Sequence, residues 1–595
     1  MTAMTRTMKP TDVVVIGLGW TGSILSMELA SEGLNVVALE RGQNRDTSPD
    51  YTYPKAADEL KYGVRGELFR KLSLETVTVR HALGDVAVPY RQYNAFLLPD
   101  HVGGAGVHWN GQLYRPSPED LKFKSRNVER YGKSFLPEGM TIQDYDVTYD
   151  ELEPYFDRFE YLNGASGQAG NLNGTIVAGG NPFEGARSRS YPTPPVADTY
   201  PAMLFAKAAR ELGYHPFPQP CANCSQPHTN FYGVRLGPCN LCGFCERFGC
   251  FLYSKGSPQT TILPALFRLP NFELRTQSHV TRINLDSTGK RATGVTYVDA
   301  SGAEIVQPAD LVILASFQTN NVRMMLLSGI GEPYDPSTGT GVIGKNFAYQ
   351  MMSSTAVFYD KDVAINPFIG AGAGGSQIVD EFNADHFDHG PHGFVGGAYI
   401  IGGQTGGRPI QQLVVPPGTP NWGAAWKRAA KDSYRHTTNV VTHGSVMSYR
   451  DAFLDLDPTY RDSLGQPLLR MTFDWHDNEY RMSRYVTDRA LEIVGRMKPK
   501  THSTLIRQQG DHFNVREYQT THTTGGVITG ADPATSALNR YLQSWDVSNL
   551  FVMGASAFPQ NIGYNPTGLV GALAFFAADA IKTRYIKNPG PLVHA

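Results

Sequence analysis

Hydrophobic and polar positions near the N-terminus follow the pattern of a strand, a helix and a second strand. Residues 12–42, "DVVVIGLGWTGSILSMELASEGLNVVALERG", start with a β-branched run, pass through glycines into an amphipathic stretch, and end in another apolar run. Continuous apolar runs of this length are typical of buried parallel strands. The pattern therefore predicts a βαβ unit within a mixed α/β fold.

Later segments predict that this sheet resumes far along the chain. Residues 43–235 are mixed and rich in Pro and Gly, which favours surface loops. Residues 272–286 and 291–316 alternate like strands of a meander followed by a buried parallel strand, and residues 549–585 predict a strand, a loop and a long helix. The Gly-rich segment 347–515, which carries Trp and Tyr residues, predicts a second domain.

Composition narrows the class of protein. A chain of 595 residues exceeds the size of a single hydrophobic core, so we expect at least two domains. With 41% hydrophobic residues, 18% charged residues and a net charge of -2, no polybasic surface favours nucleic acid. No window of about 18 apolar residues predicts a membrane span, and "MTAMTRTMKPTD" has no signal-peptide run. Six cysteines are too few for a disulfide scaffold.

A glycine motif follows the first predicted strand. Gly17, Gly19 and Gly22 form Gly-x-Gly-x-x-Gly at the start of the helix, and Glu40 ends the second strand. Glycines allow backbone amides to approach a pyrophosphate at a helix N-terminus, and the acidic residue can bind ribose hydroxyls. The context favours a dinucleotide site over an ordinary βα turn, but it does not separate FAD from NAD.

Three C-terminal segments separate those cofactors. Residues 309–331 end in "SGIG", residues 522–530 read "HTTGGVITG", and residues 549–569 read "NLFVMGASAFPQNIGYNPTGL". Together they resemble the glucose-methanol-choline (GMC) family of FAD oxidoreductases. The chain departs from that family's pattern at Gly526, where threonine is usual, and at Gly554, where aspartate is common.

The resemblance covers most of the chain in discontinuous blocks, and it implies a domain division. A Rossmann-like FAD domain is expected from residues 1–115, 236–346 and 516–595, and a discontinuous substrate domain with surface excursions from residues 116–235 and 347–515. The family resemblance also implies a catalytic pair, His522 as the base and Asn565 as a hydrogen-bond donor. Alcohol oxidation needs both roles, because a proton leaves the hydroxyl while hydride leaves its carbon. Without the resemblance, a surface histidine and a turn asparagine are the ordinary alternatives.

A second glycine loop, residues 102–111 or "VGGAGVHWNG", resembles the flavin-contacting block of the family. Its His-Trp pair is similar to that of members whose histidine is bonded covalently to the flavin, and the alternative is a histidine that only packs against it. The flavin contacts implied outside the first glycine motif are Gly103, Gly104, Gly106, His108, Trp109, Val280, Asn565 and Thr567.

Four cysteines lie within twelve positions, at Cys239, Cys242, Cys245 and Cys250 of "GPCNLCGFCERFGC". Thiolates at such short spacing can converge on one metal centre, either zinc or an iron–sulfur cluster, and unligated thiols are the remaining alternative. Zinc sites usually split their cysteines into two separated pairs, so this compact run favours iron and sulfur. The last spacing departs from the bacterial ferredoxin run, which has three residues before its final cysteine and a proline after it.

Within the family, the cysteine run resembles the large subunits of bacterial membrane-associated dehydrogenases of sugars and sugar acids. That resemblance implies a three-iron, four-sulfur cluster within residues 237–258 and a multihaem cytochrome c subunit as electron acceptor. Three thiolates suffice for such a cluster, so one of the four cysteines is not required as a ligand. Cys245 and Cys250 are the safer assignments. Cys221 and Cys224 form a separate Cys-x-x-Cys, either a redox pair or buried thiols, and we do not place them among the ligands.

The implied activity is oxidation of a secondary hydroxyl of a sugar acid, first of all carbon 2 of D-gluconate. The same scaffold acting on 2-ketogluconate, glucose, fructose or a polyol is one alternative. An oxygen-using oxidase with structural zinc and a non-catalytic electron-transfer subunit are two others. The resemblance also implies the periplasmic face of the bacterial inner membrane, reached with a small export subunit and with membrane association only through a partner. A cytoplasmic location is equally compatible with the residues themselves.

Overall fold

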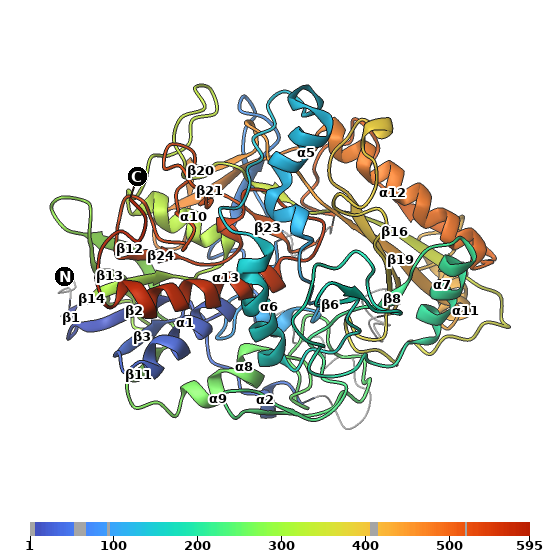
Figure 1. Cartoon of the computed structure of the whole chain (residues 1–595), viewed down its shortest axis with the longest axis horizontal. Helices are drawn as coiled ribbons and strands as arrows, with labels where there is room; N and C mark the ends of the chain where they lie inside the picture. The colour runs from blue at the N-terminus through green and yellow to red at the C-terminus, as the bar shows by residue number, and fades with distance from the viewer. Residues whose placement is uncertain (1–5, 53–66, 92–95, 405–413, 518–519, 595) are drawn as a thin grey trace.

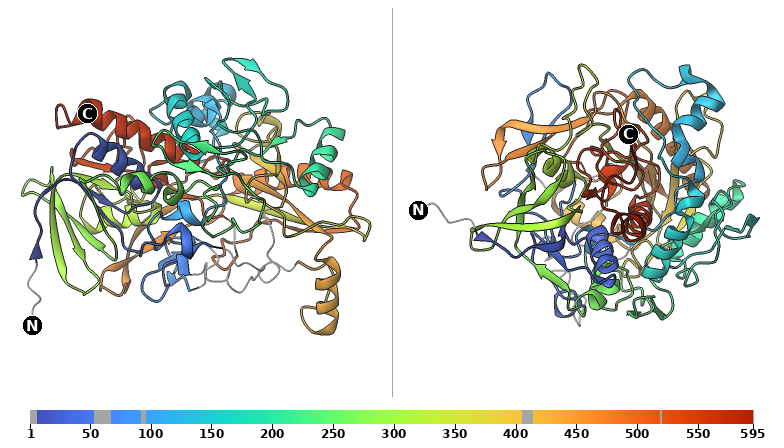
Figure 2. Two further views of the ribbon diagram at one scale, coloured as in Figure 1. Left: turned by 90° about the horizontal axis from the view of Figure 1, so that it is seen from below. Right: turned by 60° about the vertical axis from the view of Figure 1, so that its left-hand side comes forward.

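The computed structural model describes residues 6–52, 67–91, 96–404, 414–517 and 520–594. Two large sheets occupy the two ends of the long axis (Figure 1). The same separation is visible from below and from the side (Figure 2). The strands of the first sheet come from three distant parts of the chain, near its start, in its middle and near its end.

The first sheet contains the predicted βαβ unit. Strand β2 pairs with β3 in parallel, and α1 (Trp20–Ser31) connects them, as the pattern predicts. The β-branched run from Val13 to Ile16 is buried, so helices and loops cover both faces of the sheet. The strand order is β11-β3-β2-β14-β13-β12, with β1 and β24 also on β14. The bounds are β1 Arg6–Thr7, β2 Thr11–Ile16, β3 Val36–Leu39, β11 Phe272–Arg275, β12 His279–Leu285, β13 Ala292–Val298, β14 Glu304–Leu314 and β24 Leu550–Val552.

Strand β14 organises this sheet because its two halves have different partners. The half at Ala309–Leu314 pairs in parallel with β2, and its last three residues pair in parallel with β24. The half at Glu304–Pro308 pairs with β13 in antiparallel fashion, which confirms the meander of β12, β13 and β14. Strand β11 differs from the prediction: it pairs in parallel with β3 at the far edge, because residues 276–278 turn the chain away from the meander.

The C-terminal segment forms the predicted strand, loop and helix. Helix α13 (Thr567–Ala580) packs against α1 and against α6 (Tyr149–Asn163), so it covers the first sheet (Figure 1). Its first turn follows Asn565 and Pro566, and these residues reach the interior between the two sheets. The helix therefore presents its N-terminal, partially positive end to that interior.

The second large sheet has the strand order β22-β16-β19-β18-β17-β8. Helices α7 and α12 cover one of its faces and share an apolar core with it (Figure 1). A smaller sheet, β20-β21-β4-β5, joins residues 77–89 to residues 453–472. The bounds are β4 Val77–Arg80, β5 Val88–Pro89, β8 Phe217–Pro218, β16 Met351–Phe358, β17 Gln377–Val379, β18 Ala398–Gly403, β19 Thr437–Gly444, β20 Phe453–Arg461, β21 Pro467–Thr472, β22 Thr501–Leu505, α7 Tyr200–Glu211 and α12 Asp477–Arg496.

The other elements are short or peripheral, and helix α11 extends away from the body in the left view of Figure 2. Their bounds are α2 Thr47–Asp50, α4 Ala105–His108, α5 Phe123–Tyr131, α8 Pro258–Thr261, α9 Leu263–Leu266, α10 Gln318–Leu327, α11 Gly423–Ser433, β6 Asn171–Leu172, β7 Thr175–Ile176, β9 His228–Thr229, β10 Arg235–Leu236, β15 Ala348–Tyr349 and β23 Thr523–Thr524. Among the described residues, no helix is both long and apolar enough to cross a bilayer. The domain boundaries drawn from the sequence stay a prediction.

Candidate active site

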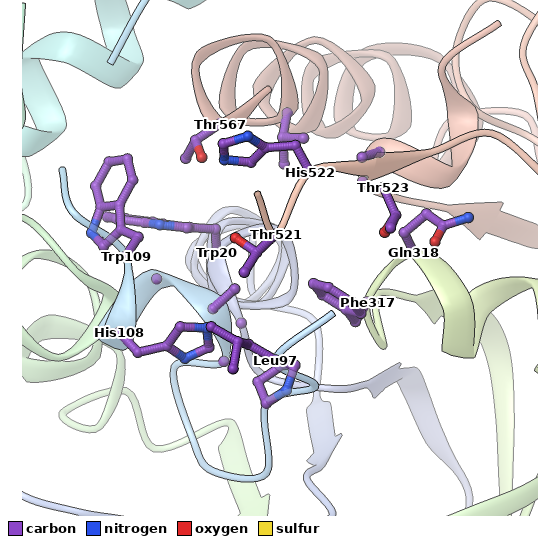
Figure 3. Close-up of a pocket in the computed structure, with 18 of the residues that line it drawn as sticks. Trp20, Leu97, His108, Trp109, Phe317, Gln318, Thr521, His522, Thr523 and Thr567 are labelled. Carbon is purple, nitrogen blue, oxygen red and sulfur yellow. The ribbon is translucent and has the colours of Figure 1, made fainter. Parts of the chain in front are cut away.

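A cavity of about 470 Å³ lies between the two large sheets. Its lining joins the glycine turn after β2 to the loop at 104–112, the strands of the second sheet and the start of α13. Figure 3 shows His522 beside Thr567 on one side of this space and His108 with Trp109 on another. Eleven residues expected at the site belong to this lining: Gly17, Gly19, Glu40, Gly104, Gly106, His108, Trp109, Val280, His522, Asn565 and Thr567.

Gly22 and Gly103 shape the walls from behind the lining. A Cβ atom on Gly22 would lie 2.0 Å from the carbonyl oxygen of Gly17, so only glycine allows the helix to start so close to the turn. The amide of Gly103 donates to the carbonyl of Leu18 at 2.7 Å, which fixes the second glycine loop against the first. A Cβ on Gly104 would lie 3.1 Å from the Cα of Gly19. The two loops form a narrow backbone-lined cradle of the kind that suits a pyrophosphate.

Glu40 stands at the end of β3 beside this cradle. Its carboxylate accepts the amides of Leu18 at 3.0 Å and Gly42 at 2.8 Å. Burial raises the pKa of Glu40 from its ordinary value, and these two amides act in the opposite direction. The oxygens are therefore held in one orientation at the cavity wall, as binding of ribose hydroxyls requires.

His522 is held by a buried amide. Gln350 donates through Nε2 to the carbonyl of Gly563 at 2.8 Å, so its Oε1 faces the histidine. Nδ1 of His522 then donates to Oε1 of Gln350 at 2.6 Å. The proton on Nδ1 is assigned from this network, and it leaves Nε2 with the lone pair. Nε2 is therefore the nitrogen that can accept a proton.

The environment keeps His522 neutral. Burial, and then the neighbouring His443, lower the pKa of His522 from about 6.5 to about 3. The side chain is exposed only in part, and it lines the cavity. A neutral ring is the form a general base needs.

Asn565 has its amide orientation fixed by two neighbours. The hydroxyl of Tyr399 donates to Oδ1 of Asn565 at 2.6 Å, and Nδ2 of Asn565 donates to Oε1 of Gln112. Nδ2 has a second hydrogen, and the side chain lines the cavity. Asn565 can therefore donate to an oxygen in the cavity without a change of protonation state.

Comparison with known proteins places this arrangement in a family. The chain matches models of the GMC oxidoreductase family over residues 146–352 and 448–574. The protein is a GMC oxidoreductase. Membership makes it an oxidoreductase of CH–OH groups and implies FAD as the cofactor, which the glycine cradle and Glu40 fit.

Relatives of this GMC oxidoreductase span nearly its whole length. The gluconate 2-dehydrogenase flavoprotein of Pantoea cypripedii is 54% identical over 591 residues, which cover 99% of this chain and 96% of the relative. The fructose dehydrogenase large subunit of Gluconobacter japonicus is 24% identical, over 96% of this chain and 97% of the relative. The solved pyridoxine 4-oxidase from Mesorbium loti shares the fold, with a TM-score of 0.60, 15% identity and coverage of 96% and 99%.

The second glycine loop of this GMC oxidoreductase, residues 102–111, is called the flavin loop below. His108 ends the short helix α4, and its ring packs edge-on against Phe69 and His101. Among the described residues, none forms a hydrogen bond with its Nδ1. Burial places the pKa of His108 well below its usual value. Trp109 is anchored by a bond from Nε1 to the carbonyl of Gly256 at 2.8 Å.

Residues 237–250, called the cysteine loop below, contact the flavin loop directly. The amide of Arg247 donates to the carbonyl of His108 at 3.0 Å, and both Glu246 and Arg247 line the cavity. Burial raises the pKa of Cys239, Cys242 and Cys245, and neighbouring thiols of the same run raise it further. The four thiols are therefore close enough to influence one another, in a loop that reaches the cavity through residues 246 and 247.

The backbone of the cysteine loop is shaped to face an anionic group. Left-handed φ angles occur at Leu241 (58°), Gly243 (77°) and Arg247 (56°). Such alternation turns successive amides toward a common point and is frequent around iron–sulfur sites. The amide of Leu241 points at the sulfur of Cys239 at 3.4 Å, and Nδ2 of Asn223 points at that of Cys245 at 3.6 Å. These donors suit thiolate ligands, so the loop fits a metal cluster.

The structure adds residues that the sequence did not indicate. Gln350 immediately precedes β16, and His443 stands on the neighbouring strand β19, where its Nδ1 also donates to Oε1 of Gln350, at 3.3 Å. Tyr399 on β18 stacks on His443 with ring centroids 5.2 Å apart. Half-buried and buried positions alternate along Thr437–Gly444, but the residues TTNVVTHG do not alternate between polar and apolar, so the sequence carried no clear signal for His443. Only strand pairing brings these residues beside His522.

The low pKa of His522 predicts an unusual pH profile. Because protonation of Nε2 would occur only as the pH falls toward about 3, the proton-accepting ring persists through the whole neutral range. We expect the rate of flavin reduction by an alcohol substrate to stay level between about pH 5 and pH 8. A histidine of ordinary pKa would become protonated as the pH falls through this range, and the rate would fall with it. Stopped-flow absorbance across this range is the measurement. A fall in rate through an apparent pKa between about 6 and 7 would contradict the assignment.

Proposed function

We propose that the protein is an FAD- and iron–sulfur-dependent dehydrogenase of a sugar acid, acting on carbon 2 of D-gluconate. The observation that carries this proposal is the pairing of a neutral, oriented His522 with Asn565 in a cavity that adjoins the cysteine loop. The relation to the gluconate 2-dehydrogenase flavoprotein supports the choice of substrate.

The chain's own residues would divide the work as follows. Nε2 of His522 accepts the proton of the substrate hydroxyl, and Nδ2 of Asn565 donates to the same oxygen as it becomes an alkoxide. FAD, when bound, would accept the hydride from the substrate carbon, and an iron–sulfur cluster would carry electrons singly. Gln350 and Tyr399 keep the two catalytic side chains in orientation.

The polar lining supports a polyhydroxylated acid as substrate. Amide and hydroxyl side chains that can bind sugar hydroxyls line the cavity: Asn110 in the flavin loop, and Ser376, Gln404 and Asn439 in or beside strands of the second sheet. Arg247 also belongs to the lining, and a guanidinium is the group that best recognises a carboxylate. We therefore propose Arg247 as the residue that faces the acid.

The spacing of the cysteines along the chain supports an iron–sulfur cluster rather than zinc. Zinc sites usually split their cysteines into two separated pairs, whereas these four lie within one short run. We propose a three-iron, four-sulfur cluster held by three or four of Cys239, Cys242, Cys245 and Cys250.

We further propose that electrons leave to a multihaem cytochrome c subunit, with a small export subunit completing a complex on the periplasmic face of the inner membrane. The name of the fructose dehydrogenase large subunit supports assembly with partners. Membrane association would then come from the partner.

A substrate panel tests the proposal. Purified protein with an artificial one-electron acceptor should oxidise gluconate at least about tenfold more efficiently than glucose, fructose, 2-ketogluconate or a polyol. If a neutral sugar is oxidised more efficiently than gluconate, that sugar is the substrate and gluconate is not. Stoichiometric peroxide together with zinc in place of iron would indicate an oxidase, and failure of every compound to bleach the flavin anaerobically would indicate a non-catalytic subunit.

We also propose that His108 bonds covalently to the flavin, because burial lowers the pKa of its ring and its Nδ1 is buried without a hydrogen-bond partner among the described residues. Acid precipitation of the native protein should leave the yellow colour in the pellet, and His108→Ala should release it to the supernatant. His101→Ala, which removes the neighbouring buried imidazole, is the control and should leave the colour in the pellet. Complete release from the native protein would show that His108 only packs against the ring.

A further inference from the structure

We propose that Lys255 ties the flavin loop to the cysteine loop and supplies the positive charge that faces the metal cluster. This inference rests on the proposed iron–sulfur function. It adds a positioning residue that sets the reduction potential of the cluster and helps to retain it.

Lys255 connects the two loops through its ammonium group alone. The residue is fully buried. Its Nζ donates to the carbonyls of Val107 at 3.1 Å and Trp109 at 2.7 Å, which flank His108 in the flavin loop. It also donates to the carbonyls of Cys245 at 2.8 Å and Phe248 at 2.6 Å, in the cysteine loop. One side chain therefore fixes the spacing between the two proposed redox groups.

The protein's carboxylates offset the charge of this ammonium only in part. Its four close partners are neutral carbonyls, and the carboxylate of Glu246 acts on Lys255 electrostatically less strongly than the neighbouring thiols do. A buried charge is costly unless an opposite charge offsets it. The thiols of Cys242, Cys245 and Cys250 are close enough to act on Lys255 electrostatically. Thiolates around an iron–sulfur core would supply the missing negative charge.

The charge of Lys255 should shift the reduction potential of the cluster in one direction. Reduction adds one negative charge to the cluster, and a nearby positive charge stabilises the reduced form. Loss of the charge should therefore make the cluster harder to reduce. A clamp without an electrostatic role would change iron retention but not this equilibrium.

Two substitutions separate the clamp from the charge. Lys255→Met removes both the donors and the charge, whereas Lys255→Gln removes the charge but keeps two of the three N–H donors. Lys345→Met is the control, because Lys345 is a partly buried lysine whose Nζ bonds to the carbonyl of Thr535, away from the cysteine loop. Iron per flavin and the electron paramagnetic resonance signal at a series of poised potentials are the readouts.

We expect Lys255→Met to retain less than about half the iron of the native protein. At one poised potential, both Lys255 variants should raise the ratio of oxidised to reduced cluster at least tenfold, which is about 59 mV for a one-electron couple. Lys345→Met should match the native protein in both readouts. If Lys255→Met does not accumulate, Lys255→Gln alone decides the electrostatic claim.

The possible results separate a failure of the role of Lys255 from a failure of the proposed iron–sulfur function. Native protein that takes up no iron after anaerobic reconstitution would overturn the cluster and, with it, the role of Lys255. Native protein that holds iron, with a Lys255→Gln variant whose poised ratio is unchanged, would overturn the electrostatic role while leaving the dehydrogenase intact.

Discussion

His522→Ala should retain its flavin and yet reduce it with substrate about 100-fold more slowly, or worse, than the native protein. The substitution removes Nε2, the only nitrogen of this ring that Gln350 leaves free to accept a proton. It leaves the glycine cradle and the backbone carbonyl of residue 522, which accepts the side-chain amide of Asn561. Stopped-flow bleaching of the flavin under anaerobic conditions is the measurement.

A matched control for this prediction lies beside the base. His443→Ala removes the second histidine bonded to Gln350 but leaves the bond between Gln350 and His522 in place. Because His443 also lowers the pKa of His522, this variant should keep most of the rate while moving the acid limb of the pH profile upward. If His522→Ala bleaches at the native rate, His522 is not the base.

Cys245→Ser should separate the two halves of the proposed reaction. Cys245 is the most deeply buried thiol of the cysteine loop, and its sulfur accepts a bond from Asn223. Replacement should remove the iron and slow electron transfer to cytochrome c by about 100-fold or more. Without the cluster, no one-electron carrier connects the reduced flavin to the cytochrome. Flavin reduction by substrate should stay within about twofold of the native rate, since Nε2 of His522 and the amide of Asn565 are untouched.

Cys224→Ser is the control for that experiment. Cys224 is fully buried and lies outside the run, with its thiol bonded to the carbonyl of Gly164 at 3.2 Å, a bond that a serine hydroxyl can replace. This variant should keep its iron and its transfer rate. Serine variants of Cys239, Cys242 and Cys250 then show by their iron content which three or four thiols are ligands. Full iron and native transfer in Cys245→Ser would remove this residue from the set.

Much of the nucleotide-binding half could be predicted because its signals are local. The βαβ unit, the glycine turn and Glu40 lie within one short stretch, where apolar runs and turn residues specify the backbone directly. Strand β11 was the exception, since its partner β3 lies more than two hundred residues earlier and no local pattern records that pairing. The family resemblance, rather than periodicity, predicted that His522 and Asn565 share a cavity.

The residues that orient the catalytic pair could not be predicted for the same reason. Gln350, Tyr399 and His443 come from three segments whose adjacency is created by the ladder of β16, β19 and β18. Lys255 has no neighbour in sequence that would indicate a buried cation, because its partners are backbone carbonyls. Every residue has a backbone carbonyl, so the residue types in a sequence do not show which carbonyls accept a hydrogen bond.

The pairing of β14 with both β2 and β24 has a consequence for biosynthesis. Strand β2 ends at Ile16, whereas β24 ends at Val552, so residues 312–314 of the central strand acquire their second parallel neighbour only after most of the chain has been translated. Contacts of such long sequence separation form slowly and leave an unpaired strand edge exposed in the meantime. The first sheet therefore stays incomplete until β24 has been translated, and we expect holdase chaperones to bind the newly made protein before its cofactor does.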